Sequence, residues 1–381
     1  MHDCEHPEIE ELVLRDRLSH IKNKIVVLSG KGGVGKSTVA ANLAMSFALK
    51  GYKTGLLDVD IHGPSIPTLF GLEGKKLQSQ GCSVLPLPYG DNLKIISIGF
   101  VLDNSDNPVI WRGPAKNGFI KQMMAQVEWG ELDYLIVDCP PGTGDEPLSV
   151  IQILEEVTGA VIVTTPQKVA ITAVRKSVNF CKQLNVPIIG VIENMSGDIF
   201  KSGGGEEMSK SMNISFLGRI PIDSKIVNAG DEGTPFVSFY KGIDTANIIE
   251  NIIEPIRNFC LKKEKEIKNM KIAIPTAKGK LCQHFGHCES FTFIEVDESS
   301  KTIISKESIK GPEHAPGVIP PWVAEQGASL ILTGGMGSRA QELFSEQGVK
   351  VIAGVPCEDP EKLVLDYLNG TLLTGINTCD H

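Results

Sequence analysis

A glycine-rich loop between an apolar run and a helical pattern constrains the fold of this chain more than any other feature. Residues 30–37 read G-K-G-G-V-G-K-S, which satisfies the pattern G-x-x-x-x-G-K-[ST]. The run before them predicts a strand, and residues 36–50 predict a helix. In such a strand–loop–helix unit, backbone N–H groups close around phosphate oxygens at the positive end of the helix dipole. The pattern therefore predicts a phosphate-binding loop.

Several residues of this loop are expected to bind Mg·ATP. Lys36 is expected to reach the β- and γ-phosphates, and the Ser37 hydroxyl to ligate Mg²⁺. The residues expected to contact the nucleotide here are Gly30, Lys31, Gly32, Gly33, Val34, Gly35, Lys36, Ser37 and Thr38.

Strand and helix patterns alternate along the first two thirds of the chain. The apolar runs are rich in Val and Ile and lack polar alternation, as is typical of strands that are covered on both faces. We therefore predict an α/β fold with a doubly wound, mostly parallel sheet. The predicted strands are 24–30, 53–60, 93–100, 133–140, 159–166, 186–194 and 214–221, and the predicted helices are 36–50, 147–156 and 170–184.

A charged run, residues 261–270, predicts a domain boundary. We expect an N-terminal tail at 1–20, an ATPase domain at 21–260, this linker, and a smaller α/β domain at 271–381. The smaller domain has predicted strands at 271–276, 290–297, 329–335 and 349–355, and predicted helices at 320–326 and 338–346.

Charge and cysteine content limit the partners and the compartment. The net charge is −9, and residues 271–381 hold 9 basic and 14 acidic side chains, so neither nucleic acid nor a membrane surface is expected as a partner. No apolar run approaches the roughly 18 residues of a membrane span. The acidic first residues are unlike a signal peptide, and nine cysteines without an export signal predict a cytoplasmic protein with reduced thiols.

The sequence K-G-G-V-G-K-S-T (31–38) resembles the deviant Walker A motif of the MinD, ParA and nitrogenase iron protein class of ATPases. The resemblance implies that Lys31 reaches across a homodimer interface to the partner's nucleotide. A cation supplied in this way neutralises charge that develops during phosphoryl transfer. The alternative is that Lys31 is a surface lysine beside a glycine turn.

Five further stretches resemble the Mrp/ApbC branch, the iron–sulfur cluster carrier ATPases. They are D-V-D-I-H-G-P-S-I-P, W-R-G-P-A-K-N-G-F-I, D-Y-L-I-V-D-C-P-P-G-T-G-D-E, T-T-P-Q-K-V-A-I-T-A-V-R-K and G-V-I-E-N-M-S-G. The resemblance implies a dimer that binds ATP and delivers a labile cluster to apo iron–sulfur or metallocluster proteins as clients. It implies that Asp60 positions water or the metal shell, that Asp138 binds Mg²⁺ through water, and that Asn194 recognises adenine.

One element of the carrier pattern is missing from this chain. Carriers usually place a C-x-x-C pair shortly after E-N-M-S, and two pairs from a dimer hold one cluster. Here the sequence continues G-D-I-F-K-S-G-G-G-E-E, and the nearest cysteines are Cys181 and Cys260. Because a [4Fe–4S] cluster needs four thiolates, the usual bridging site is not expected, and the glycines predict a flexible loop. Cys139 and Cys181 are expected to be buried structural thiols.

Residues 271–375 resemble the NifX/NifB-tail family, which implies a ribonuclease H-like α/β fold and binding of iron–molybdenum cofactor or its precursors. Cys282, His284, His287 and Cys288 lie within seven residues, and soft thiolate and imidazole ligands suit a transition metal or cluster. The alternative is a surface turn with coincidental His and Cys. The glycines of T-G-G-M-G-S-R-A, with Arg339, bind an anion or form a tight turn. The Cys and His residues near the two ends of the chain are expected to lie in disordered termini.

Three functions follow from these patterns. The first is an ATP-dependent carrier or assembly factor for iron–sulfur or related clusters, in which hydrolysis acts as a switch. The second is a ParA/MinD-type positioning switch, which needs a basic surface or a basic amphipathic helix. The third is a nucleotide-dependent interaction module without a cluster of its own, which the missing C-x-x-C pair keeps open.

Overall fold

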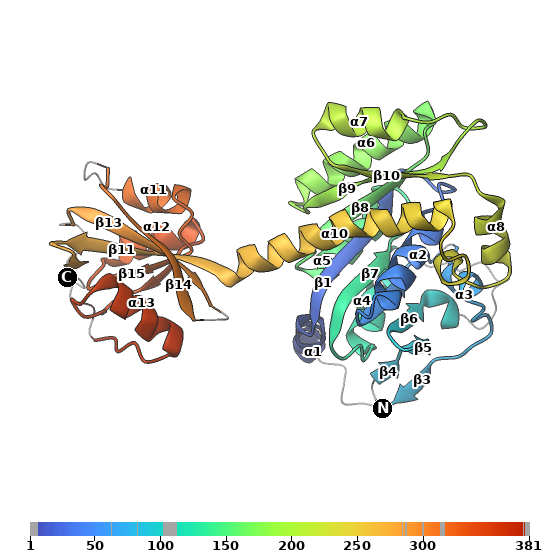
Figure 1. Cartoon of the computed structure of the whole chain (residues 1–381). Coiled ribbons are helices and arrows are strands. Elements are labelled where there is room, and N and C mark those ends of the chain that lie inside the picture. The colour runs from blue at the N-terminus through green and yellow to red at the C-terminus, as the bar shows by residue number, and fades with distance from the viewer. Residues whose placement is uncertain are drawn as a thin grey trace. The chain divides into compact units, whose positions relative to one another are not determined.

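The computed structural model describes residues 7–61, 63–81, 83–101, 113–283, 285, 288–298, 301–312, 317–375 and 377. The chain forms two compact units, Met1–Cys260 and Leu261–His381, each with its own sheet (Figure 1). The division between them falls at the start of the charged segment 261–270, most of which continues helix α10 (Asp244–Lys268). Among the described residues, no helix is long and apolar enough to cross a membrane.

An eight-stranded sheet forms the centre of the first unit. Its order is β10-β9-β8-β1-β7-β2-β6-β5, and every neighbouring pair is parallel except β5 with β6. All seven predicted strands are present, so the doubly wound, mostly parallel sheet is confirmed. The strands are β1 (Ile21–Ser29), β2 (Thr54–Asp58), β5 (Leu87–Tyr89), β6 (Leu93–Ser97), β7 (Leu132–Asp138), β8 (Gly159–Thr164), β9 (Ile188–Ser196) and β10 (Phe216–Pro221), with a separate hairpin of β3 (Gln78–Gln80) and β4 (Ser83–Leu85).

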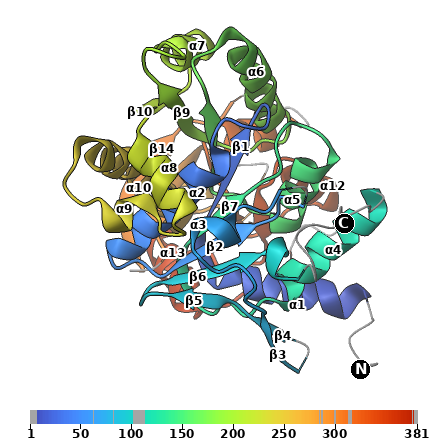
Figure 2. The same ribbon diagram turned by 90° about the vertical axis from the view of Figure 1, so that its right-hand side faces the viewer.

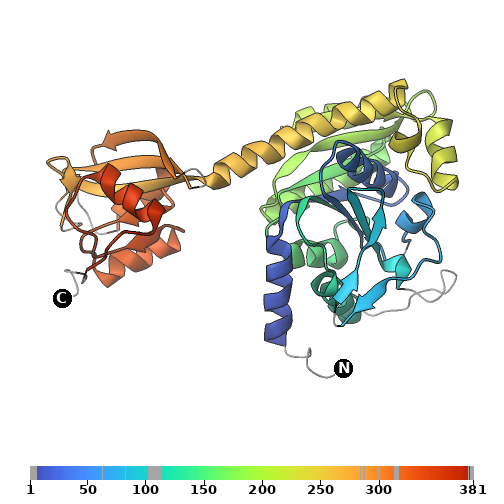
Figure 3. The same cartoon turned by 60° about the horizontal axis from the view of Figure 1, so that its bottom comes forward.

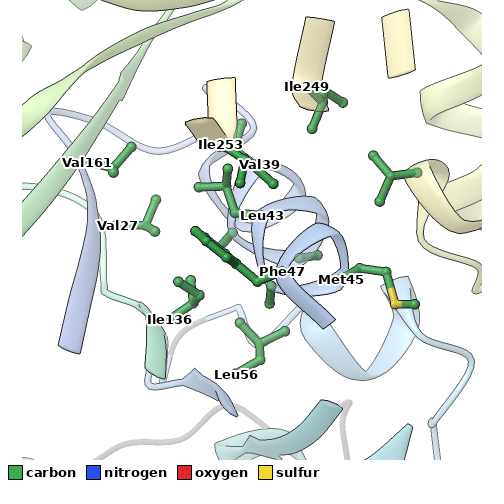
Figure 4. Close-up of a cluster of buried hydrophobic side chains, with 14 of the residues drawn as sticks. Val27, Val39, Leu43, Met45, Phe47, Leu56, Ile136, Val161, Ile249 and Ile253 are labelled. Carbon is green, nitrogen blue, oxygen red and sulfur yellow. The ribbon is translucent and has the colours of Figure 1, made fainter. Parts of the chain in front are cut away.

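Helices cover both faces of this sheet because successive strand residues point to opposite sides. Along β1, Val27 joins one buried cluster and Val26 the other. The first cluster includes side chains from α2, α3 and α8–α10, and the second from α1 and α4–α7. Figure 4 shows Val27, Leu43 and Phe47 in the first cluster, and Figure 3 shows α10 over the same side of the sheet as α2. The helices are α2 (Lys36–Leu49), α3 (Ile66–Leu69), η1 (Ile98–Phe100), α4 (Gly113–Gln126), α5 (Asp145–Leu154), α6 (Lys168–Gln183), α7 (Gly204–Met212), α8 (Ser224–Asp231), α9 (Phe236–Phe239) and α10 (Asp244–Lys268).

The segment expected to be an N-terminal tail is instead largely helical. Helix α1 (Pro7–Ser19) lies beside α4, and Leu14 and Leu18 are buried in the second cluster (Figure 2). Arg15 also forms an ion pair with Glu155, 3.0 Å away. Two leucines four residues apart lie on one face of a helix, so their burial anchors the segment to the domain.

The second unit holds a five-stranded path in the order β14-β13-β11-β15-β16, with β12 added to β11. The first three strands run antiparallel, whereas β11, β15 and β16 run parallel, as expected of a ribonuclease H-like domain. Side chains of α11 and α12 pack on one face and those of α13 on the other. The elements are β11 (Asn269–Ala277), β12 (Lys280–Leu281), β13 (Ser290–Asp297), β14 (Thr302–Ile309), α11 (Ile319–Glu325), β15 (Leu330–Leu332), α12 (Ser338–Glu346), β16 (Lys350–Ile352) and α13 (Pro360–Asn369).

Candidate nucleotide-binding site

The glycine loop lies at the carboxyl end of β1, where open α/β sheets bind their ligands. Gly33 and Gly35 have φ angles of 75° and 78°, a region that side chains other than glycine rarely adopt. Gly35 is the N-cap of α2, so the loop opens directly onto the helix N-terminus. The backbone N–H of Gly142, which follows β7, donates to the Ser29 carbonyl at 2.8 Å and thereby joins the β7 loop to β1.

Asn194 fixes the same loop from the side of β9. Its side-chain amide donates to the Val34 carbonyl at 2.9 Å, and a Cβ atom on Gly35 would collide with that amide. Asn194 also lines a largely apolar cavity beside α2, together with Thr38, Ile192 and Ile220. The geometry thus brings Asn194 against the loop that the sequence predicts to bind phosphate, with an apolar surface beside it.

Gly35→Ala is expected to lower the free energy of unfolding by about 1–3 kcal/mol and to weaken nucleotide binding, because it adds strain at a positive φ and displaces Asn194. Gly32→Ala is the matched control for stability, since a Cβ there meets no protein atom within 4 Å. Denaturant unfolding of both variants measures the difference in stability, and ATP titration of Gly35→Ala against the wild type measures the effect on binding. An equal loss of stability in the two variants would contradict the packing described for Gly35.

Two carboxyl groups and a hydroxyl surround the Lys36 ammonium. Lys36 Nζ donates to Asp138 Oδ1, lies 4.0 Å from Asp60 Oδ2, and donates to the Ser37 hydroxyl at 3.4 Å. The sheet register explains this cluster, because Asp58 and Asp138 are directly paired at the ends of the neighbouring strands β2 and β7. Lys36, Ser37, Asp60 and Asp138 are residues expected from the sequence to act on the nucleotide, and the structure brings all four together.

Asp58 is strongly perturbed by its surroundings. It is fully buried and accepts hydrogen bonds from the Ser97 hydroxyl at 2.8 Å and from the Asp60 backbone N–H at 3.1 Å. Burial, and then the nearby Asp138 carboxylate, raise the pKa of Asp58 from 3.8 to about 8. Burial likewise raises the pKa of Asp138, although Lys36 opposes the shift.

The raised pKa of Asp58 predicts that the nucleotide-free protein loses stability as the pH rises. The folded state holds a proton on Asp58 between pH 3.8 and about 8, whereas the unfolded chain releases it near 3.8, so folding is favoured most at the acid end of this window. Asp58→Asn, which stays neutral, is expected to flatten this dependence. Denaturant unfolding across the window, with chelator present, measures it. Exposed Asp91→Asn is the control, and an unchanged slope in Asp58→Asn would contradict the assignment.

The donor atoms at this site fit a magnesium ion. Asp138 Oδ2 is buried and has no hydrogen-bond partner among the described residues. A buried oxygen without a donor is costly, and a hard cation with its water shell would satisfy it. The Ser37 hydroxyl and the Asp60 carboxylate supply further oxygen donors of the kind that Mg²⁺ prefers.

Lys31 is half-buried within the loop. Its backbone carbonyl accepts a hydrogen bond from the Ser29 hydroxyl at 3.0 Å. Its ammonium forms no ion pair within the part of the chain that the structure describes. This placement leaves both interpretations of Lys31 open: a cation for a partner subunit, or a surface lysine beside a turn.

The glycine-rich segment after E-N-M-S is not the flexible loop that the sequence predicted. The Glu193 carboxylate, fully buried, accepts hydrogen bonds from the backbone N–H groups of Gly203 at 2.9 Å and Gly205 at 2.6 Å. Arg219 Nε donates to the same carboxylate at 2.8 Å. These contacts hold the start of α7 against β9, and a carboxylate at a helix N-terminus is favoured by the helix dipole. Cys139 and Cys181 are fully buried, as expected, and burial raises the pKa of both thiols.

Only part of the predicted metal-binding group in the second unit is described. Cys282 and Cys288 are half-buried on either side of Phe285, whereas His284 and His287 lie outside the described residues. Burial, followed by the nearby Cys282, raises the pKa of Cys288 to about 11. In the described part of the chain, no three His, Cys, Asp or Glu side chains are placed to share a metal ion. Arg339 lies exposed on α12.

Comparison with known proteins places both units in families. Residues 20–257 match the model described as NUBPL iron-transfer P-loop NTPase, and residues 268–370 match the dinitrogenase iron-molybdenum cofactor model. A protein of Methanocaldococcus jannaschii named iron-sulfur cluster carrier protein is 46% identical over 267 residues, which cover 67% of this chain and 91% of that protein.

A solved structure is similar to the first unit. It is a nucleotide-binding protein of Archaeoglobus fulgidus in complex with ADP, with cobalt found by PIXE. The two are 36% identical, with a TM-score of 0.53, over 62% of this chain and 98% of that one. These matches favour the carrier interpretation over the positioning switch. The chain belongs to the family of NUBPL iron-transfer P-loop NTPases, and it carries a second domain of the dinitrogenase iron-molybdenum cofactor family.

Proposed function

We propose that this chain is an ATP-binding and ATP-hydrolysing carrier or assembly factor for iron–sulfur or related metal clusters. The observation that carries the proposal is the convergence of Lys36, Ser37, Asp60 and Asp138 beside the glycine loop. The family match, and the similarity to the iron-sulfur cluster carrier protein of Methanocaldococcus jannaschii, support a metal cluster as the cargo. Hydrolysis acts as a slow switch between two dimer geometries, one that holds the cluster and one that releases it.

Each residue at the proposed nucleotide site has a distinct role. The backbone amides of residues 30–38 and the Lys36 ammonium bind the phosphates, and Asn194 contacts the base. The Ser37 hydroxyl and the Asp138 carboxylate would hold Mg²⁺, which would supply positive charge to neutralise the β- and γ-phosphates. We assign the orientation of the attacking water to Asp60, because its carboxylate lies 4.0 Å from the Lys36 ammonium and belongs to the same buried cluster.

The proposed functional unit is a homodimer in the cytoplasm. Lys31 of each subunit reaches the nucleotide of its neighbour and stabilises the charge that develops during phosphoryl transfer. Dimerisation therefore depends on nucleotide. Apo iron–sulfur or metallocluster proteins are the clients, and the acidic chain does not bind nucleic acid or membrane as its main partner.

The cargo site differs from the usual carrier site. The segment after E-N-M-S contains no cysteine and therefore supplies no thiolate. Gly203 and Gly205 instead lie at the start of helix α7. We assign the metal contact to Cys282, His284, His287 and Cys288 of the second domain, since thiolate and imidazole suit iron and related metals. The absence of a C-x-x-C pair after E-N-M-S also favours a second candidate function, a nucleotide-dependent interaction module that binds no cluster.

Cluster transfer tests the carrier proposal against this alternative. Protein reconstituted anaerobically with iron and sulfide is mixed with an apo-ferredoxin, with and without Mg·ATP, and the client's visible spectrum is followed. The carrier proposal predicts transfer whose rate changes several-fold with Mg·ATP. Transfer at the rate of free iron and sulfide, with and without nucleotide, would support the interaction module.

A further inference from the structure

The end of strand β9 carries the side chain that meets the glycine loop. Successive residues of a strand point to opposite faces of the sheet, so Ile192 lies in the first buried cluster and Val191 in the second. Asn194 shares the face of Ile192, and both line the cavity beside α2. The Asn194 nitrogen donates to the Val34 carbonyl at 2.9 Å. Because only the nitrogen of an amide can donate to a carbonyl, this bond fixes how the amide is turned and leaves its oxygen as the acceptor for a ligand.

Glu193, the preceding residue, lies on the opposite face and is held by three donors. One oxygen of its fully buried carboxylate accepts from the Gly203 N–H and from Arg219 Nε, and the other accepts from the Gly205 N–H. Arg219 is also the residue of β10 that pairs with Glu193. Charge-assisted hydrogen bonds to both oxygens therefore hold the strand at Glu193 against α7 and β10.

Strand β9 contains a bulge directly after Glu193. Arg219 of β10 pairs with Glu193, and the following pair is Pro221 with Ser196. Two residues of β9 thus stand opposite one residue of β10. Met195, the second of the two, has a φ angle of 55°, a left-handed conformation that residues other than glycine seldom adopt. Bulges redirect side chains, and they are frequent beside functional sites.

The bulge is also held on its far side. The Ile222 N–H donates to the Ser196 carbonyl at 2.9 Å. The Met195 methyl lies close to the glycine loop, since a Cβ atom on Gly35 would lie 3.3 Å from it. A left-handed residue of this kind persists only where its surroundings hold it in place. Asn194 therefore lies between two fixed points of the strand.

We propose that the bulge at Met195, held by Glu193, positions Asn194 to select nucleotides whose base carries an exocyclic amine, as adenine does. The inference rests on the proposed nucleotide site, and it adds two positioning residues that act through Asn194. The turned amide presents an oxygen, which accepts a hydrogen bond from an amine and repels a carbonyl at the same ring position.

ATP, ITP and inorganic tripolyphosphate, each with Mg²⁺, are the probes. ITP carries a carbonyl where ATP carries the amine, and tripolyphosphate has no base. Calorimetric titration of the full chain gives the ratio of the ATP affinity to the ITP affinity, which is expected to be at least about tenfold in the wild type. Asn194→Ala is expected to bring the ratio within about twofold of equal affinity. Loss of folded protein lowers the number of sites in a preparation and leaves the ratio unchanged.

Two variants of Met195 separate positioning from packing. Met195→Val is expected to reduce the ratio to about threefold or less, because a β-branched residue is excluded from the left-handed region. Met195→Gly removes more of the side chain but accepts the left-handed conformation, so its ratio is expected to stay within about twofold of the wild type. Tripolyphosphate affinity is expected to change by less than about threefold in both variants, since the phosphate loop itself is intact.

Glu193→Gln tests the residue that holds the bulge. The amide keeps the shape of the side chain but replaces one acceptor oxygen with a donor, so the ratio is expected to fall at least about threefold. Glu206→Gln is the matched control. Glu206 also pairs with Arg219, at 3.1 Å, but it is partly exposed on α7. Its replacement is expected to leave the ratio within about twofold of the wild type.

The outcomes distinguish this inference from the proposed function. A ratio lost in Met195→Gly and kept in Met195→Val would show that Met195 acts by packing, and would overturn the role of the bulge. An unchanged ratio in Glu193→Gln would overturn the role of Glu193. Wild-type protein that binds ATP and ITP equally well would overturn the inference and leave the nucleotide site in place. No binding of any of the three probes would overturn both.

Discussion

Lys36→Ala is expected to weaken Mg·ATP binding by about 30-fold or more. Removing one partner of a buried charge pair costs about 2–5 kcal/mol, and here the Lys36 ammonium is only 6% exposed. Its loss also leaves Asp138 without its cationic partner, so the free energy of unfolding is expected to fall by about 3–5 kcal/mol. Calorimetric titration with Mg·ATP measures the first effect and denaturant unfolding the second.

Lys50, at the end of the same helix, provides a matched control. It lies just after α2, and its ion pair with Glu254, at 3.3 Å, is partly exposed to solvent. Lys50→Ala is expected to change nucleotide affinity by less than about twofold, because partly exposed ion pairs contribute little. If Lys36→Ala bound Mg·ATP as tightly as Lys50→Ala, the site assigned to Lys36 would be wrong.

Lys31→Ala is expected to lower ATP hydrolysis by about 10³-fold while nucleotide affinity changes little. A cation supplied to the transition state by a partner is worth about 10³–10⁵ in rate. Lys31 is half-buried and forms no ion pair with the described residues, so its removal leaves no buried charge unpaired. Single-turnover hydrolysis and calorimetry of the same preparation separate rate from affinity.

Mixing two inactive variants tests whether Lys31 acts on the partner. In a mixed dimer, a Lys36→Ala subunit still carries Lys31, and a Lys31→Ala subunit still binds nucleotide. If Lys31 acts across the interface, the mixture hydrolyses ATP far faster than either variant alone. The doubly substituted chain mixed with Lys31→Ala is the control. Recovery in neither mixture would favour the surface-lysine interpretation.

Strands covered on both faces were predictable because burial selects Val and Ile without polar alternation. The edge strand β14 was missed, because its side chains are mostly exposed and its position depends on pairing with β13. Helix α1 was missed for a similar reason. Leu12 is 66% exposed, so the apolar pattern is weak, and only the packing of Leu14 and Leu18 on α4 defines the helix.

The site was predictable where a local motif carries it and was missed where strands from distant parts of the sequence meet. The pattern of Gly30, Gly35, Lys36 and Ser37 along the sequence identifies the phosphate loop without any knowledge of the fold. The coupling of Asp58 to Asp138 depends on β2 lying beside β7, which neither segment encodes alone. The anchoring of Gly203 and Gly205 by Glu193 likewise joins segments that the local pattern treats as a strand end and a loop.

Iron and sulfide content after anaerobic reconstitution tests the carrier account most directly. The full chain is reconstituted, freed of unbound metal by gel filtration, and assayed chemically. The account predicts iron and sulfide in about equal amounts, with at least about one iron per chain, and loss of most of that iron in the Cys282→Ser variant. Wild-type protein that binds Mg·ATP but retains no stoichiometric iron would contradict it.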